Sequence, residues 1–139
     1  MPNTPEADLI VALTHLQSRI EKQLSGPLSV HGISLTEFLV MRQLQRAPHG
    51  RLRRIDLAQG AGLSASGITR LLGPMEKIGL VEKVAAERDA RVSLMALSKA
   101  GARIYREAEA TFAEAAATLL APLGDRDRTA LARIVGTLL

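Results

Sequence analysis

The sequence predicts a mainly α-helical fold with a small β-hairpin, and two observations carry this prediction. Over most of the chain, apolar residues recur every three or four positions, which is the spacing that places them on one face of a helix. Between Val81 and Leu97 the pattern changes, because strand-forming apolar residues stand on both sides of a polar stretch from Glu87 to Arg91. A chain of 139 residues with this apolar content can form one domain with helical extensions around a genuine core.

Two amphipathic helices are predicted in the first third of the chain. The first runs from Asp8 to Leu24 and ends at Gly26-Pro27; its apolar stripe is Leu9, Leu13, Leu16, Ile20 and Leu24. The second begins after Ser34, because Ser34-Leu35-Thr36-Glu37 has the pattern of a capping box. It ends at Ala47-Pro48, and His49-Gly50 closes it.

A short helix, a tight turn and a second helix follow. Arg54 to Gly60 gives one or two helical turns, with Ile55, Leu57 and Ala58 available for packing, and Ala61-Gly62-Leu63 forms the connection. The second helix begins at Ser64 and ends at Gly79; its apolar face is Ile68, Leu71, Leu72, Met75 and Ile78. Gly73-Pro74 is expected to interrupt and kink this helix, because Pro74 has no N–H to bond the carbonyl of Arg70. The arrangement is a helix-turn-helix.

The second helix of such a unit lies in the major groove of DNA, and its first residues reach the base edges. Here the candidates at that end are Ser64, Ser66, Gly67, Thr69 and Arg70. Small hydroxyl residues let the helix end approach DNA closely, its free N–H groups favour phosphate, and Arg70 can contact guanine through two hydrogen bonds. Ser64 has a second explanation, because a helix cap alone accounts for a serine at that position.

The positive charge of the chain is concentrated around this unit. From Arg51 to Arg106 there are eleven Lys and Arg against five Asp and Glu, a net charge of +6, which leaves −2 for the two ends together. This is the electrostatic pattern of a DNA-binding module, although surplus basic charge also serves solubility. Arg51, Arg53 and Arg54 either contact backbone phosphate or form a solvated run before the short helix.

These motifs together resemble a known family. GLSASGITRLLGPMEKIGLVEK, followed by ERDARVSLMALSKAG, is similar to the winged helix-turn-helix core of MarR-type bacterial transcriptional regulators. In those proteins the wing carries Asp-x-Arg, then a strand ending in Leu-Thr or Leu-Ser and a nearby Gly. Asp89-Ala90-Arg91, Leu97-Ser98 and Gly101 stand in these positions, whereas Val92 replaces the further acidic residue that many members carry.

The resemblance implies roles for the residues at the wing tip. Arg91 is expected to enter the minor groove, with Arg88 as a second candidate contact. Asp89 is expected to orient Arg91 or to brace the loop, because a carboxylate facing phosphate directly would be repelled. The alternative for Arg91 is an ordinary solvated surface charge.

The chain ends in two further predicted helices. An Ala-rich helix runs from Ser98 to about Ala121, Pro122 and Gly124 mark a corner, and the last helix spans Asp125 to Leu139. The terminal helices carry more apolar surface than a winged helix alone needs, which predicts an interface. The resemblance implies a homodimer with dimerisation helices in residues 1–33 and 101–139 around a DNA-binding domain in residues 34–100. The alternative is a monomer whose terminal helices cover its own core.

The function that follows is a ligand-responsive transcriptional repressor that binds double-stranded DNA as a homodimer. Two-fold symmetry predicts a pseudo-palindromic operator with half-sites about 34 Å apart. The alternative is a winged helix that contacts only other proteins. The resemblance also implies a small aromatic or phenolic anion as effector, held between the dimerisation helices and the reading domain, with His15, Arg19 and Arg42 as candidate contacts. A solvated or hydrogen-bonded side chain is the alternative for His15.

Other function classes are excluded by what the sequence lacks. There is no Cys for a disulfide, a thiol sensor or a Cys-based zinc site, and His15, His31 and His49 lack the spacing of metal ligands. Gly60-x-Gly62-x-x-Ala65 fits a loose dinucleotide-binding pattern but follows a helical rather than a strand sequence. No nucleophile elbow, P-loop or zinc-protease helix is present, so neither an enzyme nor a cofactor is expected. Without a signal peptide or an apolar run of membrane-spanning length, a cytoplasmic protein is expected.

Overall fold

The computed structural model describes residues 3–86 and 93–139 of the chain. Within these ranges the helices are α1 (Pro5–Ser29), α2 (Leu35–Arg46), α3 (Arg54–Ala61), α4 (Ala65–Lys77), α5 (Lys99–Leu120) and α6 (Asp125–Leu138). A single 3-10 turn, η1 (Pro48–Gly50), follows α2, and the strands are β1 (Arg51–Arg53), β2 (Val81–Ala85) and β3 (Ser93–Leu97). The prediction of a mainly helical fold with a small β element is confirmed.

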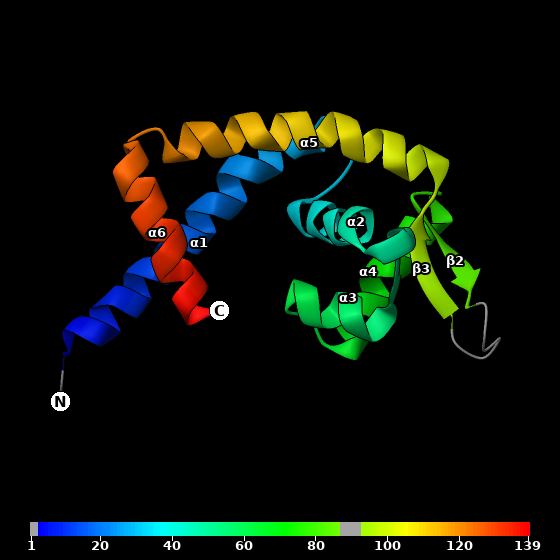
Figure 1. Ribbon diagram of the computed structural model, residues 1–139, viewed down its shortest axis with the longest axis horizontal. Coiled ribbons are helices and arrows are strands. Elements are labelled where there is room, and N and C mark those ends of the chain that lie inside the picture. The colour runs from blue at the N-terminus through cyan, green and yellow to red at the C-terminus, as the bar shows by residue number, and fades with distance from the viewer. Residues whose placement is uncertain (1–2, 87–92) are drawn as a thin grey trace.

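The helices are arranged around α5, which extends along one side of the whole molecule (Figure 1). Helices α2, α3 and α4 lie on the side of its first half, next to the strands, and together they form the winged body. Helix α1 packs along the second half of α5, and its N-terminal turns extend away from the body, whereas α6 turns back from the end of α5. The fold therefore has a compact end and an open, helical end.

Three serines set the starts of three helices, as the sequence predicts. Ser34, Ser64 and Ser98 each have extended backbone angles, and each hydroxyl accepts a hydrogen bond from the backbone N–H three residues later. Satisfying an otherwise unpaired helical donor in this way contributes about 1 kcal/mol per cap. The capping box at Ser34 is complete, because Glu37 accepts from the Ser34 N–H at 2.8 Å.

The wing contains a third strand that the sequence pattern does not predict. The strand order is β1-β3-β2 with antiparallel pairing throughout, so β3 lies in the middle. Leu52 of β1 pairs with Met95, and on the other side Lys83 of β2 pairs with the same residue. Strand β1 is too short and too charged to show alternation, so its pairing depends on the free edge that β3 offers.

Two predicted helix interruptions are wrong, and both involve proline. Helix α1 does not stop at Gly26-Pro27 but continues to Ser29, where Leu28 is fully buried. Pro27 has no N–H to bond the carbonyl of Gln23, and the burial of Leu28 in the core offsets this loss and favours continuation of the helix. Helix α4 likewise runs through Gly73 and Pro74 to Lys77. Both residues are exposed, so water can hydrate the carbonyl of Arg70 that Pro74 leaves without a helical donor.

One continuous core holds the winged body to the two long helices. Leu28 of α1, Phe38 of α2 and Tyr105 of α5 are buried in the same cluster as Leu57, Leu72 and Met95. The ring of Phe38 stacks on Tyr105 with centroids 5.3 Å apart and on Phe112 with centroids 4.4 Å apart. Stacked aromatic pairs add to the free energy of burial, so this stack fastens α2 to α5.

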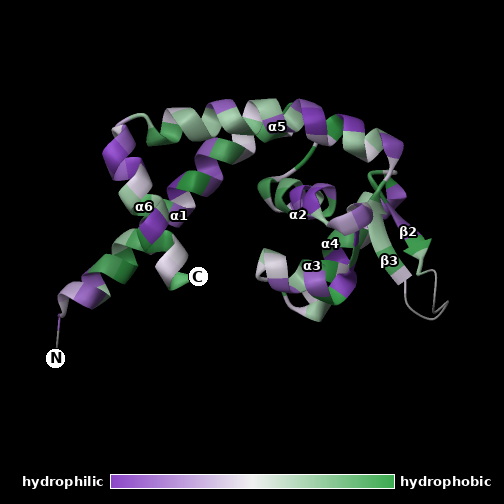
Figure 2. Cartoon of the chain, in the orientation of Figure 1, coloured by the Kyte–Doolittle hydropathy of each residue, from purple (hydrophilic) through white to green (hydrophobic). Residues whose placement is uncertain are grey.

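The open end of the molecule carries exposed apolar side chains. The first part of the predicted stripe on α1 is solvent-facing, whereas its continuation at Leu24 is buried. Along α6, which the structure describes completely, no residue is buried. Figure 2 shows the hydrophobic residues of both helices away from the winged body. We call the following residues the terminal apolar face: Leu9, Ile10, Leu13, Leu16, Ile134, Val135 and Leu138.

Candidate nucleic-acid interface

Helices α3 and α4 form the predicted helix-turn-helix. Gly62 ends α3 with a left-handed backbone (φ +67°), a conformation that glycine adopts without steric cost. The N–H groups of Gly62 and Leu63 bond back to the carbonyls of Gln59 and Ala58 at 3.2 and 2.8 Å. Ser64 then starts α4, so only two residues separate the last helical residue of α3 from the cap of α4.

The predicted DNA-reading residues lie together at the start of α4. Ser64, Ser66, Thr69 and Arg70 are all exposed, and Gly67 is partly covered by the cap. The Ser64 hydroxyl accepts from the Gly67 N–H at 3.0 Å and lies 3.2 Å from the Ser66 hydroxyl. Thr69 donates its hydroxyl to the carbonyl of Ala65 at 3.0 Å. We call the segment from Ser64 to Arg70 the α4 leading turn. Arg70 supplies the one long, charged hydrogen-bond donor in this segment.

The opposite face of α4 is fixed in the core. Ile68, Leu72 and Met75 are buried, which holds the leading turn with its polar side outward. Leu71 is half-buried, and Ile78 is exposed rather than part of the predicted apolar face. Ile78 misses the core because it is the C-terminal cap, where the chain leaves the helix and turns at Gly79 (φ +81°). In α3, Leu57 and Ala58 pack as predicted, but Ile55 is exposed.

The three arginines before and at the start of α3 differ in their partners. Arg53 holds the carboxylate of Asp56 through two hydrogen bonds, from Nε at 3.0 Å and from Nη2 at 3.2 Å. These hydrogen bonds, with a smaller contribution from the attraction between the two charges, lower the pKa of Asp56 and raise the pKa of Arg53. Arg51 lies in β1, and Arg54 borders Thr69 in a shallow apolar pocket between α3 and α4. Positive charge thus continues beside the leading turn.

The predicted interface also includes the residues between the two long strands of the wing. Arg88, Asp89 and Arg91 lie outside the described residues, between β2 and β3. Strand β2 begins four residues after α4 ends, and β3 pairs with it from Ala85 opposite Ser93. The strands therefore start from the far end of α4 and lead to the segment that carries the predicted wing arginines.

Residues 31–92, which include the helix-turn-helix and most of the wing, match the sequence model of the MarR family. The same fold occurs in Sco3205 from Streptomyces coelicolor, a MarR family transcriptional regulator solved in complex with DNA. The two superpose with a TM-score of 0.87 at 20% identity, over 99% of this chain and 89% of Sco3205. Over residues 31–92 the chain is therefore similar in sequence to the MarR family, and its whole fold is similar to that of solved MarR family regulators. AbsC, a MarR family transcriptional regulator from the same organism, gives a TM-score of 0.86 at 20% identity over 99% of this chain and 95% of AbsC.

A curated relative adds a sequence comparison. The HTH-type transcriptional repressor Rv2887 of Mycobacterium tuberculosis is 28% identical over 118 residues, which cover 85% of this chain and 84% of Rv2887. The transcriptional repressor MprA of Escherichia coli K12 is 26% identical over 93 residues, or 67% of this chain. The chain spans about half of the length of MprA, since the match covers 53% of it.

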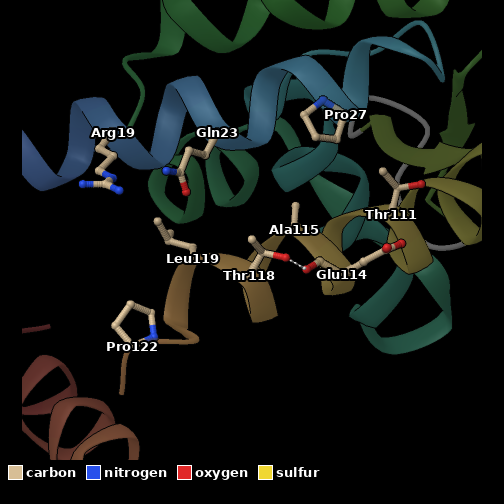
Figure 3. Close-up of a pocket in the computed structure, with 9 residues that line it drawn as sticks. All are labelled: Arg19, Gln23, Pro27, Thr111, Glu114, Ala115, Thr118, Leu119 and Pro122. Carbon is tan, nitrogen blue, oxygen red and sulfur yellow. Dashed lines mark hydrogen bonds between the residues drawn. The ribbon is translucent and has the colours of Figure 1, made fainter. Parts of the chain in front are cut away.

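The structure separates the three residues predicted to contact an anionic effector. Arg19 lines a groove of about 560 Å³ between α1 and α5, which we call the α1–α5 groove (Figure 3). Its lining residues are Arg19, Gln23, Pro27, Thr111, Glu114, Ala115, Thr118, Leu119 and Pro122. Arg42 instead lines a different groove, of about 380 Å³, beside α2, β1 and α3. His15 is exposed one turn before Arg19 and lines neither of these grooves. The three side chains therefore do not form one site within this chain.

The other lining residues of the α1–α5 groove are missed by the sequence reasoning. On α1 they recur every four residues, at Arg19, Gln23 and Pro27, which is a visible helical pattern. Nothing in that pattern indicates which face of α5 lies opposite, because the pairing of two helices so far apart in the chain is a tertiary property. Thr111 also bonds to His31 Nε2 at 2.6 Å, which accounts for this histidine without a metal.

Two further results bear on the other function classes. Across residues 3–86 and 93–139, no three His, Cys, Asp or Glu side chains are grouped so as to hold a metal ion. Among the helices that the structure describes, none combines the length and the apolar content needed to cross a bilayer. The MarR family matched by this chain consists of transcriptional regulators, not enzymes.

Proposed function

We propose that this protein is a sequence-specific transcriptional repressor that binds double-stranded DNA as a homodimer and works in the cytoplasm. The observation that carries the proposal is the α4 leading turn, where Ser64, Ser66, Thr69 and Arg70 face solvent while Ile68 anchors the helix in the core. The match of residues 31–92 to the MarR family model supports the same function, as do relatives that are named transcriptional repressors.

In this proposal each part of the winged body has a separate task. The leading turn enters the major groove, where Arg70 contacts a guanine edge and the hydroxyls of Ser66 and Thr69 approach bases or phosphates. Arg88 and Arg91 at the wing tip contact the adjacent minor groove, and Asp89 orients Arg91. Family members bound to DNA, such as Sco3205, support this use of the fold.

The homodimer is supported by the terminal apolar face. Three leucines of α1 and the apolar residues of α6 are exposed on helices that extend beyond the winged body. Several large apolar side chains exposed on the same helix normally mark an interface. Two-fold pairing through these helices would present two leading turns to one side of a duplex, about one helical turn apart.

The α1–α5 groove is the best location for an effector. Arg19 supplies a cation, and Pro27 and Leu119 supply apolar walls, which suits a small aromatic or phenolic anion bound at the Arg19 end. The carboxylate of Glu114 lies at the other end of the groove and would repel an anion there. His15 and Arg42 would contribute only in an assembly that brings other surfaces to this groove. We call the winged body of each protomer a reading head. If the dimer adopts two arrangements that differ in the spacing of its reading heads, an anion that binds one arrangement more tightly shifts the population toward it and so changes the affinity for the operator.

Fluorescence anisotropy with a random duplex at two salt concentrations tests DNA binding. We expect affinity to fall steeply as salt rises, with a log–log slope near −0.9 for each neutralised phosphate. Absent or salt-insensitive binding would instead support a winged helix that contacts only proteins. Selection of bound duplexes from a random pool, with and without phenolic acids, then defines the operator and the effector class.

Analytical ultracentrifugation tests the dimer independently of DNA. We expect the full-length chain to sediment as a dimer and Leu16→Glu to shift it toward the monomer, because the substitution places a charge in the terminal apolar face. Val30→Glu is a matched control, since Val30 is also exposed but lies outside the terminal apolar face. A wild-type chain that remains monomeric at high concentration would refute the two-fold arrangement.

A further inference from the structure

Hydrogen bonds connect the segment after the end of α4 to the start of α5. The N–H groups of Gly79 and Leu80 bond back to the carbonyls of Glu76 and Met75 at 3.1 and 2.9 Å, which closes the end of α4. The carbonyl of Leu80 then accepts from the backbone N–H of Ser98 at 3.1 Å. One residue, Leu80, thus bonds to α4 through its N–H and to the cap of α5 through its carbonyl.

The side chain of Ser98 adds a second connection at the same place. Its hydroxyl accepts from the Gly101 N–H at 2.9 Å, which caps α5, and donates to the carbonyl of Gly79, with the Leu80 carbonyl oxygen also 3.3 Å away. Ser34 and Ser64 cap their helices too, but among the described residues their hydroxyls bond only within their own segments. Ser98 differs because its hydroxyl bonds to Gly79, the residue directly after the C-terminal cap of the reading helix.

The backbones of the two segments are also in direct contact. A Cβ added at Gly101 would overlap the carbonyl oxygen of Leu80, so α5 approaches this residue as closely as a glycine allows. Gly101 is buried, and so is the side chain of Leu80. We call Gly79, Leu80, Ser98 and Gly101 the α4–α5 joint.

From this geometry we infer that Ser98 is a positioning residue for the binding of DNA. This inference rests on the proposed function. It touches no DNA itself, because it lies at the opposite end of α4 from the leading turn. Its hydroxyl holds the reading helix at one angle to α5, the helix that continues toward the terminal apolar face. In a dimer this fixes the distance between the two leading turns, and therefore the half-site spacing that the protein accepts.

This role predicts a specific pattern of affinities. A protein whose reading heads adopt the required spacing only part of the time binds the full operator more weakly in proportion to that fraction. Binding to a single half-site does not depend on the spacing, because only one reading head contacts the DNA. Loosening the joint should therefore weaken binding to the full operator, leave half-site binding unchanged and broaden the accepted spacing.

The test uses the full-length chain, its selected operator, that operator with the half-sites moved by about two base pairs, and a duplex with one half-site. For Ser98→Ala we expect affinity for the operator to fall about fivefold, with half-site affinity unchanged and less discrimination against the altered spacing. Ser98→Thr keeps the hydroxyl and should behave like the wild type. Ser34→Ala is the matched control, because it removes a helix cap whose bonds, in the part of the chain described, stay within one segment.

Each result has a distinct meaning. A Ser98→Ala chain that loses half-site and operator affinity equally, or a Ser98→Thr chain that behaves like Ser98→Ala, would overturn the positioning role. If Ser34→Ala accepts the same wider range of half-site spacings, the positioning role is also overturned, because general destabilisation of the fold would then explain the effect of Ser98→Ala. A wild-type chain that ignores spacing would refute two-fold reading itself, and with it the function on which the inference rests.

Discussion

Arg53 holds Asp56 through two hydrogen bonds of 3.0 and 3.2 Å at the first turn of α3. Both side chains are exposed, at 59% and 36%, so the pair itself contributes little to the stability of the fold. The pair has a different importance because it lies at the start of α3, the helix that packs against α4. The carboxylate neutralises a guanidinium that could otherwise contact the phosphate backbone.

Asp56→Asn should therefore strengthen binding to DNA of random sequence. Freed from its carboxylate, Arg53 can neutralise one more phosphate, so the log–log slope of affinity against salt should become steeper by about 0.9. Anisotropy with a random duplex at several salt concentrations measures this slope. The double variant Arg53→Ala with Asp56→Asn is the control and should lose the gain. An unchanged slope in Asp56→Asn would place Arg53 away from the duplex.

Arg70→Ala should relax the preference at one base position of the operator. A bidentate arginine contact with guanine discriminates by about 1–3 kcal/mol, and the leading turn offers no other long donor. Operators with single base changes, compared by competition, measure the effect. Lys77→Ala, at the far end of the same helix, should leave the base preference intact. Equal loss on all sequences would mean that Arg70 contacts phosphate only.

Arg91→Ala should weaken operator binding without changing dimerisation or thermal stability. An arginine in the minor groove meets the strong negative potential there, so its loss should also reduce the salt slope by about 0.9. Operator titration, sedimentation and thermal melting test the three parts separately. If operator affinity does not change, the assignment of the wing is wrong.

Gly101→Ala should destabilise the fold, whereas Gly136→Ala should not. A methyl group at Gly101 would overlap the Leu80 carbonyl oxygen, a backbone atom that cannot move aside cheaply. Overpacking of this kind lowers the free energy of unfolding by about 1–3 kcal/mol. Gly136 is an exposed glycine within α6, and a methyl group there would meet no atom of the described residues within 4 Å, so alanine should be neutral or slightly stabilising. Urea denaturation of both variants compares the two positions, and equal effects would contradict the close contact.

Tyr105 should make stability depend on pH in the alkaline range. Burial, with a smaller contribution from the nearby Glu109 carboxylate, raises the pKa of Tyr105 from its ordinary value of 10.0 to about 12. Because the folded state favours the neutral phenol, its contribution is complete below about pH 10 and is lost as the pH rises toward about 12. Tyr105 is the single tyrosine and there is no tryptophan, so phenolate absorbance reports this ionisation directly. A folded-state titration near the ordinary value would contradict the prediction.

Tyr105→Phe provides the matched variant. Within the part of the chain that the structure describes, the buried hydroxyl of Tyr105 has no hydrogen-bond partner. Removing an unpaired buried hydroxyl while keeping the ring on Phe38 should leave stability unchanged or raise it by about 1 kcal/mol. The variant should also lose the tyrosine contribution to the alkaline pH dependence.

The features that local chemistry determines could be predicted from the sequence. Each of the capping serines marks a helix start, and Gly62 and Gly79 stand where the chain needs a left-handed backbone. The exposure of the leading turn follows from the same helical spacing that buries Ile68 and Leu72. These elements were predictable because each depends on residues within one or two turns.

The features that depend on distant partners could not be predicted in this way. Strand β1 exists because Leu52 finds Met95 across the sheet, and α1 passes Pro27 because Leu28 reaches the core. The separation of Arg19 from Arg42 likewise depends on how α1, α2 and α5 pack. Helical periodicity places each arginine on a face of its own helix, but it contains no information on which grooves those faces border.

The shared core also limits how the protein can be divided. Leu24 and Leu28 lie before the predicted boundary at residue 33, and Tyr105 and Ala108 lie after the one at residue 100, yet all four are buried against the winged body. An excised fragment of residues 34–100 would leave the hydrophobic surface beneath them open to water and prone to aggregation. A chimera that transplants this reading head onto another regulator must therefore carry these four side chains, or the recipient's equivalents, along with it.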